Sequence, residues 1–297
     1  MISSKYILII ILLIIIIIII FFYIKLTLLY HPYPVLQNKY EKFYQKLIKL
    51  TETKNNIYNF SIKTIDNILL DTIYINNPDT KRCVIYFHGN TGNISMRFEI
   101  IKFLYNYCSV VAFDYRSFGK STGNFYNLSS YTLRNDALAI WDFTKNKLGY
   151  NADNISLFGE SLGCSIILDL TAELSKTFDY MQYPHSIVLN APFYSLSSMI
   201  NLYLNKMNMG FLSRIFEFML GYEYKSNELI KYINHKTKII FAHSLYDEII
   251  PFDQGLKLCR SIEKYRNDIY FIILTGTHNN LKLTDTYIYI LADIFMN

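Results

Sequence analysis

The sequence feature that most constrains the fold is a serine with a glycine two positions away on each side, Gly159-Glu160-Ser161-Leu162-Gly163. The apolar run 155–158 before it has the pattern of a buried strand, and 164–176 has the pattern of a helix. A sharp turn between the two would strain the backbone of Ser161 and project its hydroxyl out of the sheet. Bulky side chains at 159 and 163 would collide with the neighbouring strand and helix. The motif predicts a nucleophile elbow, and an ordinary glycine-flanked turn is the alternative.

Short apolar strands alternate with amphipathic helices after residue 57, which predicts a mostly parallel sheet covered by helices on both faces. The expected strands are 57–63, 68–75, 83–87, 110–113, 155–158, 187–189, 238–242 and 269–274. The expected helices are 95–107, 129–147, 164–176, 252–265 and 285–295. The fold class is therefore α/β, with one large globular domain over 57–297.

One interval breaks this alternation, between the strand that ends near Leu189 and the strand that begins at Lys238. It is rich in Met, Phe and Leu, and it accommodates two helices broken near Met209-Gly210. We expect a small helical cap insertion at about 193–235. Such an insertion would lie over the carboxyl ends of the strands, where ligands bind in sheets of this kind.

The N-terminus carries an isoleucine-rich run, 6–24, that contains no charged residue and is bracketed by Lys5 and Lys25. A run of this length can cross a hydrocarbon core as a helix. A cleavable signal peptide is the rival interpretation, but its apolar core is normally shorter and small residues follow it. We expect an uncleaved single-pass transmembrane anchor (a signal-anchor) over 1–25, with the lipid bilayer as its partner, and a membrane-proximal connector over 26–56. The flanking lysines do not decide which side of which membrane the domain faces.

Several functions are disfavoured by composition and motif. A net charge of +5 without a dense Lys/Arg patch argues against nucleic-acid binding. The four cysteines are far apart and form no C-x-x-C pair, so we expect reduced core residues and no metal site. Gly119-Lys120-Ser121 resembles the end of a phosphate loop, but Asp114 stands where that loop requires its first glycine, which excludes nucleotide binding. We expect this segment to be a structural loop whose Arg116 pairs with a carboxylate, and we expect no cofactor.

A serine nucleophile needs a base, and the base needs an orienting acid. Asp247 follows the strand 238–242 and His278 follows the strand 269–274, so both come after Ser161 in the order Ser, Asp, His. Taken alone, Asp247 has the alternative of a helix-cap carboxylate, and His278 that of a surface loop residue. Glu248 competes with Asp247 for the acid, and we favour Asp247 because the following Ile-Ile-Pro suggests that Glu248 begins the return into packed structure.

Acyl transfer also requires donors for an oxyanion. The loop His88-Gly89-Asn90 follows the strand 83–87, and its glycine allows the backbone to approach a substrate closely. We predict that the backbone amides of Asn90 and Leu162 form the oxyanion hole. We expect His88 to stabilise the loop.

Several of these motifs together resemble the Bem46-like group of the alpha/beta-hydrolase superfamily. The resemblance covers about residues 57–297 and rests on HGNTGN at 88–93, DYRSFGKSTG at 114–123, GESLG at 159–163, the Asp247 segment ending in Ile-Ile-Pro, and Gly-Thr-His-Asn at 276–279. It implies an alpha/beta-hydrolase fold with Ser161 as nucleophile, Asp247 as orienting acid and His278 as base. The N-terminal apolar run is also similar to that group. Two departures are Ser117 and Cys164, which stand where the group usually has glycine.

The function expected from these features is a membrane-anchored serine hydrolase that cleaves ester or thioester bonds through an acyl-enzyme. Lipid esters or S-acylated proteins are candidate substrates, because flexible thioethers in the insertion suit an adaptable acyl-chain pocket. The competing interpretation is that those residues simply pack the insertion onto the domain. A catalytically dispensable membrane-anchored scaffold of the same fold and a serine peptidase are the alternative functions. The sequence specifies no protein partner.

Overall fold

The computed structural model describes residues 4–176, 183–220, 223–266 and 268–296. Over these residues the main sheet has nine strands in the order β11-β10-β9-β8-β7-β4-β6-β3-β2, and the six central strands from β10 to β6 run parallel. The main-sheet strands are β2 (Ile57–Lys63), β3 (Leu69–Ile75), β4 (Cys83–Phe87), β6 (Ser109–Phe113), β7 (Ile155–Glu160), β8 (Ser186–Asn190), β9 (Lys238–Ser244), β10 (Ile269–Thr277) and β11 (Asn280–Lys282). The predicted mostly parallel sheet is confirmed.

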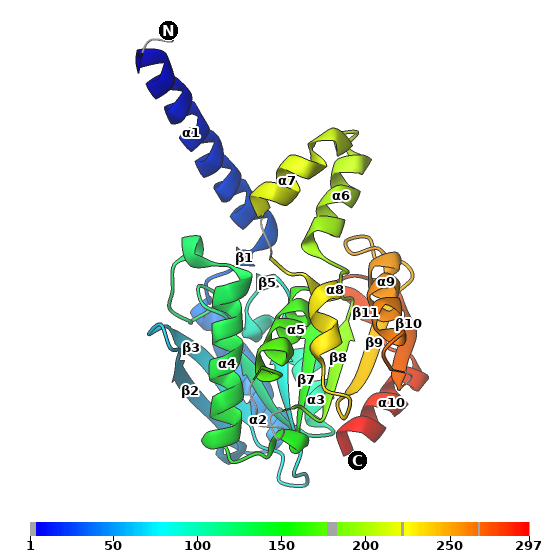
Figure 1. The fold of residues 1–297 in the computed structure, drawn as a ribbon. Helices are drawn as coiled ribbons and strands as arrows, with labels where there is room; N and C mark the ends of the chain where they lie inside the picture. The colour runs from blue at the N-terminus through cyan, green and yellow to red at the C-terminus, as the bar shows by residue number, and fades with distance from the viewer. Residues whose placement is uncertain (1–3, 177–182, 221–222, 267, 297) are drawn as a thin grey trace.

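Helices cover both faces of this sheet (Figure 1). The helices of the described residues, including α1 and the cap helices that rise away from the sheet, are α1 (Ser4–Leu29), α2 (Gln37–Thr51), α3 (Phe98–Tyr105), α4 (Ser130–Asn146), α5 (Leu162–Leu174), α6 (Leu196–Lys206), α7 (Ser213–Leu220), α8 (Ser226–Leu229), α9 (Phe252–Glu263) and α10 (Asp285–Met296). Short 3₁₀ turns lie between them at Lys54–Asn56, Ile94–Met96, Phe125–Asn127, Ala152–Asn154, Gly210–Leu212 and Ile230–Tyr232.

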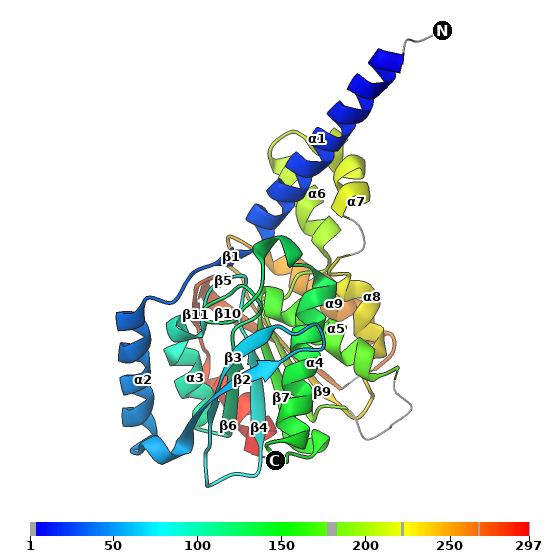
Figure 2. The ribbon, with the colours of Figure 1, turned by 90° about the vertical axis from the view of Figure 1, so that its left-hand side faces the viewer.

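The alternation of side chains along the strands explains why two layers of helices are needed. In β4, Cys83, Ile85 and Phe87 pack into the core beneath α4, α5 and α9. Val84 and Tyr86 point the other way and pack into a second core beneath α2, α3 and α10. Because every residue of β4 is buried, the strand is apolar throughout and requires cover on both sides. Figure 2 shows α2 and α3 on one side of the strands and α4 and α5 on the other.

The insertion after β8 forms the two helices that the sequence predicts, with a break at Gly210–Leu212. We call residues 195–220 the cap. It rises from the carboxyl end of the sheet on the same side of the domain as α1 (Figures 1 and 2).

The N-terminal helix α1 ends at Leu29, just before His31-Pro32, as the two prolines of the connector predict. Its root is fixed to the domain, because Leu26 and Tyr30 are buried in the main core and the Tyr30 hydroxyl lies 2.6 Å from that of Tyr224. Among the residues that the structure describes, no helix meets the length and apolarity required of a membrane span. The predicted single-pass anchor is therefore not supported.

Candidate active site

Ser161 occupies the strained turn that the sequence motif predicts, between the end of β7 and the start of α5. Its backbone angles are φ 53° and ψ −116°, a region that non-glycine residues rarely adopt. Glycine is required at positions 159 and 163 because neighbouring backbone lies too close for a side chain. A Cβ at Gly163 would lie 2.2 Å from the carbonyl oxygen of Phe87, and one at Gly159 would lie 2.8 Å from the backbone of Gly163. Strand, turn and helix therefore meet too closely for any side chain at these two positions.

The structure brings Asp247 and His278 together. The Nδ1 atom of His278 lies 2.7 Å from Oδ2 of Asp247, so the imidazole donates its Nδ1 hydrogen to the carboxylate and leaves Nε2 as the basic nitrogen. The competing acid Glu248 has a different partner, because its Oε2 accepts from the backbone amide of His278 at 3.0 Å. Asp247 thus orients the ring, and Glu248 holds the loop that carries it.

Asp247 is held rigidly by its own loop. Its Oδ1 accepts hydrogen bonds from the amides of Ile249 and Ile250 at 3.0 and 2.7 Å, which leaves Oδ2 for the imidazole. Burial alone would raise the pKa of this carboxyl, but hydrogen bonds from His243 and His278 outweigh burial and lower the pKa below its usual range. The acid therefore stays ionised and able to stabilise a charged imidazole.

His243 is a supporting residue that the sequence reasoning did not single out. It is fully buried, donates from Nε2 to the carbonyl of Ile250 at 2.8 Å, and lies 3.5 Å from Oδ2 of Asp247. A Cβ at Gly255 would come within 2.2 Å of its Nδ1, so a glycine on α9 makes room for the ring. Its position at the end of a buried strand, four residues before Asp247, was the available signal.

His278 lies at the tip of a tight hairpin and not in the open loop that the sequence suggests. Thr277 in β10 pairs with Asn280 in β11, so His278 and Asn279 form the two-residue turn. The hydroxyl of Ser244, at the end of β9, donates to the carbonyl of Gly276 at 2.6 Å and ties this hairpin to the loop of the acid. The base is therefore positioned by paired backbone on two sides.

Ser161, Asp247 and His278 follow the carboxyl ends of β7, β9 and β10, which lie at one edge of the sheet. The strand register aligns Glu160 with Asn190, Ala242 and Ile272 across this edge. The Ser161 amide extends the ladder by donating to the carbonyl of Asn190 at 2.9 Å. Within the described residues, the Ser161 hydroxyl makes no hydrogen bond, so Ser161 and His278 lie after the carboxyl ends of their strands without a direct bond between them. Such bonds often tighten only when substrate is present.

The two predicted oxyanion donors have free amides. Among the described parts of the chain, no acceptor pairs with the backbone N–H of Asn90 or of Leu162. Leu162 is the first residue of α5, where amides lack an intrahelical partner. Asn90 is fixed by the segment after α1, since its carbonyl accepts from the amide of His31 at 2.9 Å and its side chain donates to the carbonyl of Leu29 at 3.2 Å.

His88 supports the oxyanion loop from below. It is fully buried, with Nδ1 2.7 Å from the carbonyl of Gly89, and its ring lies 4.4 Å from that of Tyr115. Burial, reinforced by the nearby charge of Arg97, lowers the pKa of His88 to about 3. A neutral, packed imidazole agrees with the predicted structural role.

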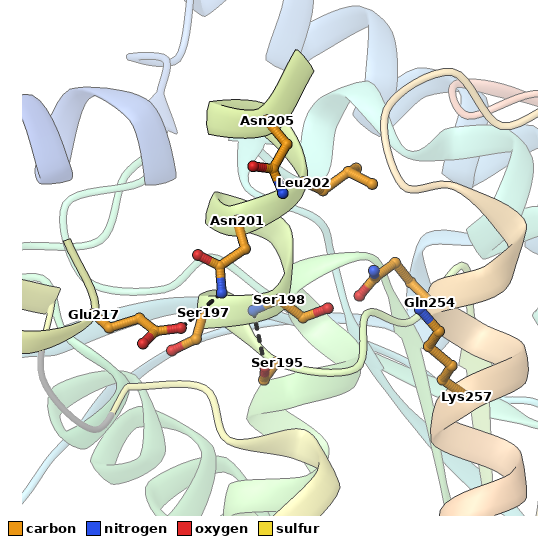
Figure 3. Close-up of a pocket in the computed structure, with 9 residues that line it drawn as sticks. All are labelled: Ser195, Ser197, Ser198, Asn201, Leu202, Asn205, Glu217, Gln254 and Lys257. Atoms are coloured by element: carbon orange, nitrogen blue, oxygen red, sulfur yellow. Dashed lines mark hydrogen bonds between the residues drawn. The ribbon is translucent and has the colours of Figure 1, made fainter. Parts of the chain in front are cut away.

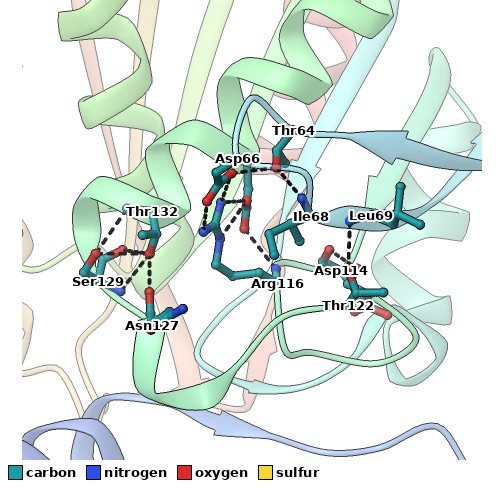
Figure 4. A network of polar contacts seen from close by, with 12 residues as sticks. Thr64, Asp66, Ile68, Leu69, Asp114, Arg116, Thr122, Asn127, Ser129 and Thr132 are labelled. Carbon is teal, nitrogen blue, oxygen red and sulfur yellow. Dashed lines mark hydrogen bonds and ion pairs between the residues drawn. The ribbon is translucent and has the colours of Figure 1, made fainter.

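Arg116 forms the carboxylate pairs that its sequence position predicts (Figure 4). Its guanidinium donates to Asp136 on α4 at 2.7 Å and to Asp66 in the β2–β3 turn at 2.6 Å. The loop thus connects a hairpin, a helix and the sheet. Ser117, one of the two departures from the resembling group, adopts φ 65°, a left-handed conformation that favours glycine. The other departure, Cys164, packs without exposure, and all four cysteines are free and buried, as predicted.

A polar cavity of about 430 Å³ lies between α6 of the cap and α9 (Figure 3). It is lined by Ser195, Ser197, Ser198, Asn201, Leu202, Asn205, Glu217, Gln254 and Lys257. Gln254 is 2% exposed and accepts from the amide of Tyr194 at 3.3 Å. Ser161, Asp247 and His278 do not line this cavity, and the Tyr203 hydroxyl of α6 links the cap to the loop of Asp247 by donating to the carbonyl of Ile249 at 2.7 Å. In the described residues no group of three or more His, Cys, Asp or Glu side chains converges as a metal-ligand set.

No family model matches the chain. It is 53% identical over 273 residues to the uncharacterized protein R595 of Acanthamoeba polyphaga mimivirus, covering 92% of each chain. It is also similar to protein bem46 of Schizosaccharomyces pombe, at 26% identity over 78% of this chain and 74% of that one. The chain belongs to the Bem46-like group of the alpha/beta-hydrolase superfamily.

Other members and neighbours agree with this assignment. The lysophosphatidylserine lipase ABHD12 of Gallus gallus is 28% identical over 69% of this chain, which spans about half (54%) of the length of that relative. An esterase of Pyrococcus furiosus, Pf2001, has the same fold, with a TM-score of 0.65 at 18% identity over 90% of this chain and 96% of that one. The Bem46-like assignment made from the motifs is thereby confirmed.

Proposed function

We propose that this Bem46-like protein is a serine hydrolase that cleaves ester bonds through Ser161, His278 and Asp247. The observation that carries the proposal is the pairing of His278 with Asp247 at 2.7 Å, at the sheet edge where the elbow presents Ser161. An imidazole oriented by a buried carboxylate and placed near a serine at a strained turn is arranged to accept the proton of that serine.

The chemistry follows from these positions. Nε2 of His278 removes the hydroxyl proton as Ser161 attacks the carbonyl carbon, and the Asn90 and Leu162 amides stabilise the oxyanion. The tetrahedral intermediate collapses to an acyl-enzyme when His278 returns the proton to the leaving alcohol. Water then attacks the acyl-enzyme, with His278 again acting as base, and the carboxylic acid leaves. Asp247, ionised throughout, stabilises the imidazolium that forms at each step.

We propose a lipid ester with a polar head group as the substrate. The relative ABHD12 is a lysophosphatidylserine lipase by name, and the polar cavity between α6 and α9 supports a substrate with a hydrophilic part. The lining of the cavity includes one acidic side chain, Glu217, and one basic side chain, Lys257, on different helices. Thioesters undergo the same attack and are the second bond type to assay.

We further propose that α1 associates with a lipid bilayer. Its side chains include a series of exposed apolar residues, among them Leu8, Ile9 and Leu12, each at least half exposed. Exposure of an apolar helix to water is unfavourable in free energy, and burial of the helix in lipid removes this cost. Lipid association would place the hydrolase domain beside lipid substrates.

The nucleophile is tested with a fluorophosphonate probe, which reacts with activated serines. The wild-type protein should be labelled and Ser161→Ala should not. Ser175→Ala is the matched control, because Ser175 lies at the other end of α5 and its hydroxyl bonds only the carbonyl of Ala172. Labelling that persists in Ser161→Ala would refute the assignment.

The acid is tested by comparing Asp247→Asn with Glu248→Gln. Asp247→Asn should lower kcat by about 10⁴, the loss expected when the orienting carboxylate becomes an amide. Glu248→Gln should stay within about tenfold of wild type, because Glu248 contacts only the backbone of His278. Equal losses of kcat in the two variants would contradict the assignment of different roles to Asp247 and Glu248. Hydrolysis of lysophospholipid esters against p-nitrophenyl acetate would test the substrate class, and a preference for the acetyl ester would overturn the lipid proposal.

A further inference from the structure

The cap carries four large apolar side chains that are each more than half exposed in the described structure. Met207 is 65% exposed, Phe211 80%, Ile215 53% and Phe218 88%. We call these four residues the cap rim. They follow one another at three- and four-residue spacings, and Ile215 and Phe218 share one face of α7 while Phe211 lies in the 3₁₀ turn before it. None of the four lines the cavity between α6 and α9, and each is more than half exposed.

The cap, which carries the cap rim, lies on the same side of the domain as α1 in both views (Figures 1 and 2). The cap and α1 are also joined at their bases, because Tyr30 follows α1, Tyr224 follows the cap, and their buried hydroxyls lie 2.6 Å apart. A lipid or protein surface that contacts the C-terminal end of α1 therefore lies close to the base of the cap.

The apolar character of α1 indicates which partner covers this side of the protein. Ile11, Leu12 and Leu13 are consecutive and about half exposed. At 3.6 residues per turn, consecutive side chains point in widely different directions. A folded protein partner covers one stripe of a helix, whereas lipid covers all directions at once. A bilayer is therefore a better occupant than a second copy of the chain.

The charges of the cap agree with a bilayer surface. The cap contains two cations, Lys206 and Arg214, and one acid, Glu217. Oε1 of Glu217 accepts a hydrogen bond from Asn201 at 2.6 Å. Basic residues that flank exposed aromatic and aliphatic side chains are typical of segments that bind the surface of anionic membranes.

We infer that the cap rim is a second membrane contact, which inserts into the same phospholipid bilayer that α1 contacts. The inference rests on the proposed lipid association of α1 and adds a face that the helix alone does not require. With two contacts the domain has a fixed orientation, and the cap, together with the polar cavity between α6 and α9, lies at the lipid surface. A lipid ester then moves from the bilayer to Ser161 without crossing bulk water.

The test uses the full chain carrying Ser161→Ala, so that its outcome does not depend on turnover. Phe218→Trp adds a reporter to the cap rim, and Tyr289→Trp adds a second exposed reporter on α10, at the opposite end of the domain (Figure 1). The native Trp141 is fully buried and supplies a constant background. Each protein is mixed with vesicles of phosphatidylcholine and phosphatidylserine, with or without bromine on the acyl chains, and vesicle binding is measured by flotation.

We expect the brominated lipid to reduce the added emission of Phe218→Trp by about half or more, as for a side chain at the head group and acyl-chain boundary, and to leave Tyr289→Trp unchanged. Flotation without quenching of Phe218→Trp would overturn the cap contact while leaving the association of α1 intact. A blue-shifted, unquenched reporter with a doubled mass would assign the cap rim to a second copy. Absence of flotation would overturn both membrane proposals, and the fluorophosphonate result would still stand alone.

Discussion

Backbone strain at the nucleophile yields a quantitative prediction: Ser161→Gly should be more stable than Ser161→Ala although both are inactive. Ser161 adopts φ 53° and ψ −116°, which glycine tolerates and any residue with a Cβ does not. Alanine keeps the Cβ and therefore keeps the strain. Because the Ser161 hydroxyl makes no hydrogen bond within the described structure, its removal alone should change little.

The size of the effect follows from two opposing terms. Strained backbone of this kind costs about 1–3 kcal/mol, which glycine releases. Glycine also adds freedom to the unfolded chain, which costs about 0.5–1 kcal/mol. The net gain of Ser161→Gly over Ser161→Ala is therefore about 1 kcal/mol at the middle of these ranges. For a domain of this size, that difference raises Tm by about 2–4 °C.

The assay is thermal unfolding followed by the emission of Trp141, which is buried in the folded protein and exposed on unfolding. All variants are measured in the same detergent. The matched control is Ser175→Gly, because Ser175 has an ordinary helical φ of −68° at the end of α5. Glycine there should lower stability by about 0.5–1 kcal/mol, since no strain is released.

A Tm for Ser161→Gly equal to or below that of Ser161→Ala would refute the reasoning. It would mean that the elbow stores no strain at Ser161, or that the helix start relaxes equally in both variants. Equal behaviour of Ser161→Gly and Ser175→Gly would also count against stored strain, because the expected difference between these two variants comes from backbone conformation alone.

Three further predictions concern the elbow, the buried ion pairs and the oxyanion loop. Gly163→Ala forces a Cβ to within 2.2 Å of the Phe87 carbonyl oxygen and should destabilise the protein by about 1–3 kcal/mol in urea unfolding. Gly89→Ala is the control, because the nearest atoms lie 3.6 Å away, and it should change the free energy of unfolding by less than about 0.5 kcal/mol. Equal losses in the two variants would contradict the steric explanation. Arg116→Met leaves the buried Asp136 unpaired and should cost about 3–5 kcal/mol. Burial raises the pKa of the Asp136 carboxyl to about 6 even beside Arg116, so the folded state binds a proton at Asp136 more tightly than the unfolded state does. The free energy of unfolding of the variant should therefore increase as the pH falls from 7 to 5. The pKa of His88 is lowered to about 3 by burial, so the unfolded state binds more protons between pH 6.5 and about 3, and stability should fall as pH falls through that window. Removing this titration in His88→Asn should lessen the stability lost between pH 7 and pH 5 by about 2 kcal/mol, and an unchanged pH profile would contradict it.

The order of strands and helices was predictable because their signal is local. Every residue of β4 is apolar, and the residues of β4 point alternately into two cores, so the run predicts a strand covered on both sides. Helix α4 begins where expected, since Ser129 accepts from the amide of Thr132 and caps the helix within three residues. The β11 strand was missed because Asn280–Lys282 is short and polar, and it exists only through pairing with β10.

The candidate site likewise has one part that a local sequence pattern predicts and another part that depends on folding. The elbow was readable from sequence because two glycines and a serine meet a steric requirement within five residues. The preference for Asp247 over Glu248 rested only on the following Ile-Ile-Pro, since adjacent carboxylates otherwise carry the same local signal. Folding separates them, because the 2.7 Å contact of Asp247 with the ring and the 3.0 Å contact of Glu248 with the backbone depend on how the β9 loop meets the β10 hairpin.

By itself the sequence determined the fold class, the turn at Ser161 and the order in which Asp247 and His278 follow it after successive strands, because each of these depends on neighbouring residues and on their apolar periodicity. Only the tertiary structure decided that Asp247 pairs with His278, that His243 supports the acid from a buried position, and that the cap turns four large apolar residues outward. These outcomes depend on contacts between segments far apart in the chain. Such contacts are set by sheet register and helix packing, and no local pattern encodes them.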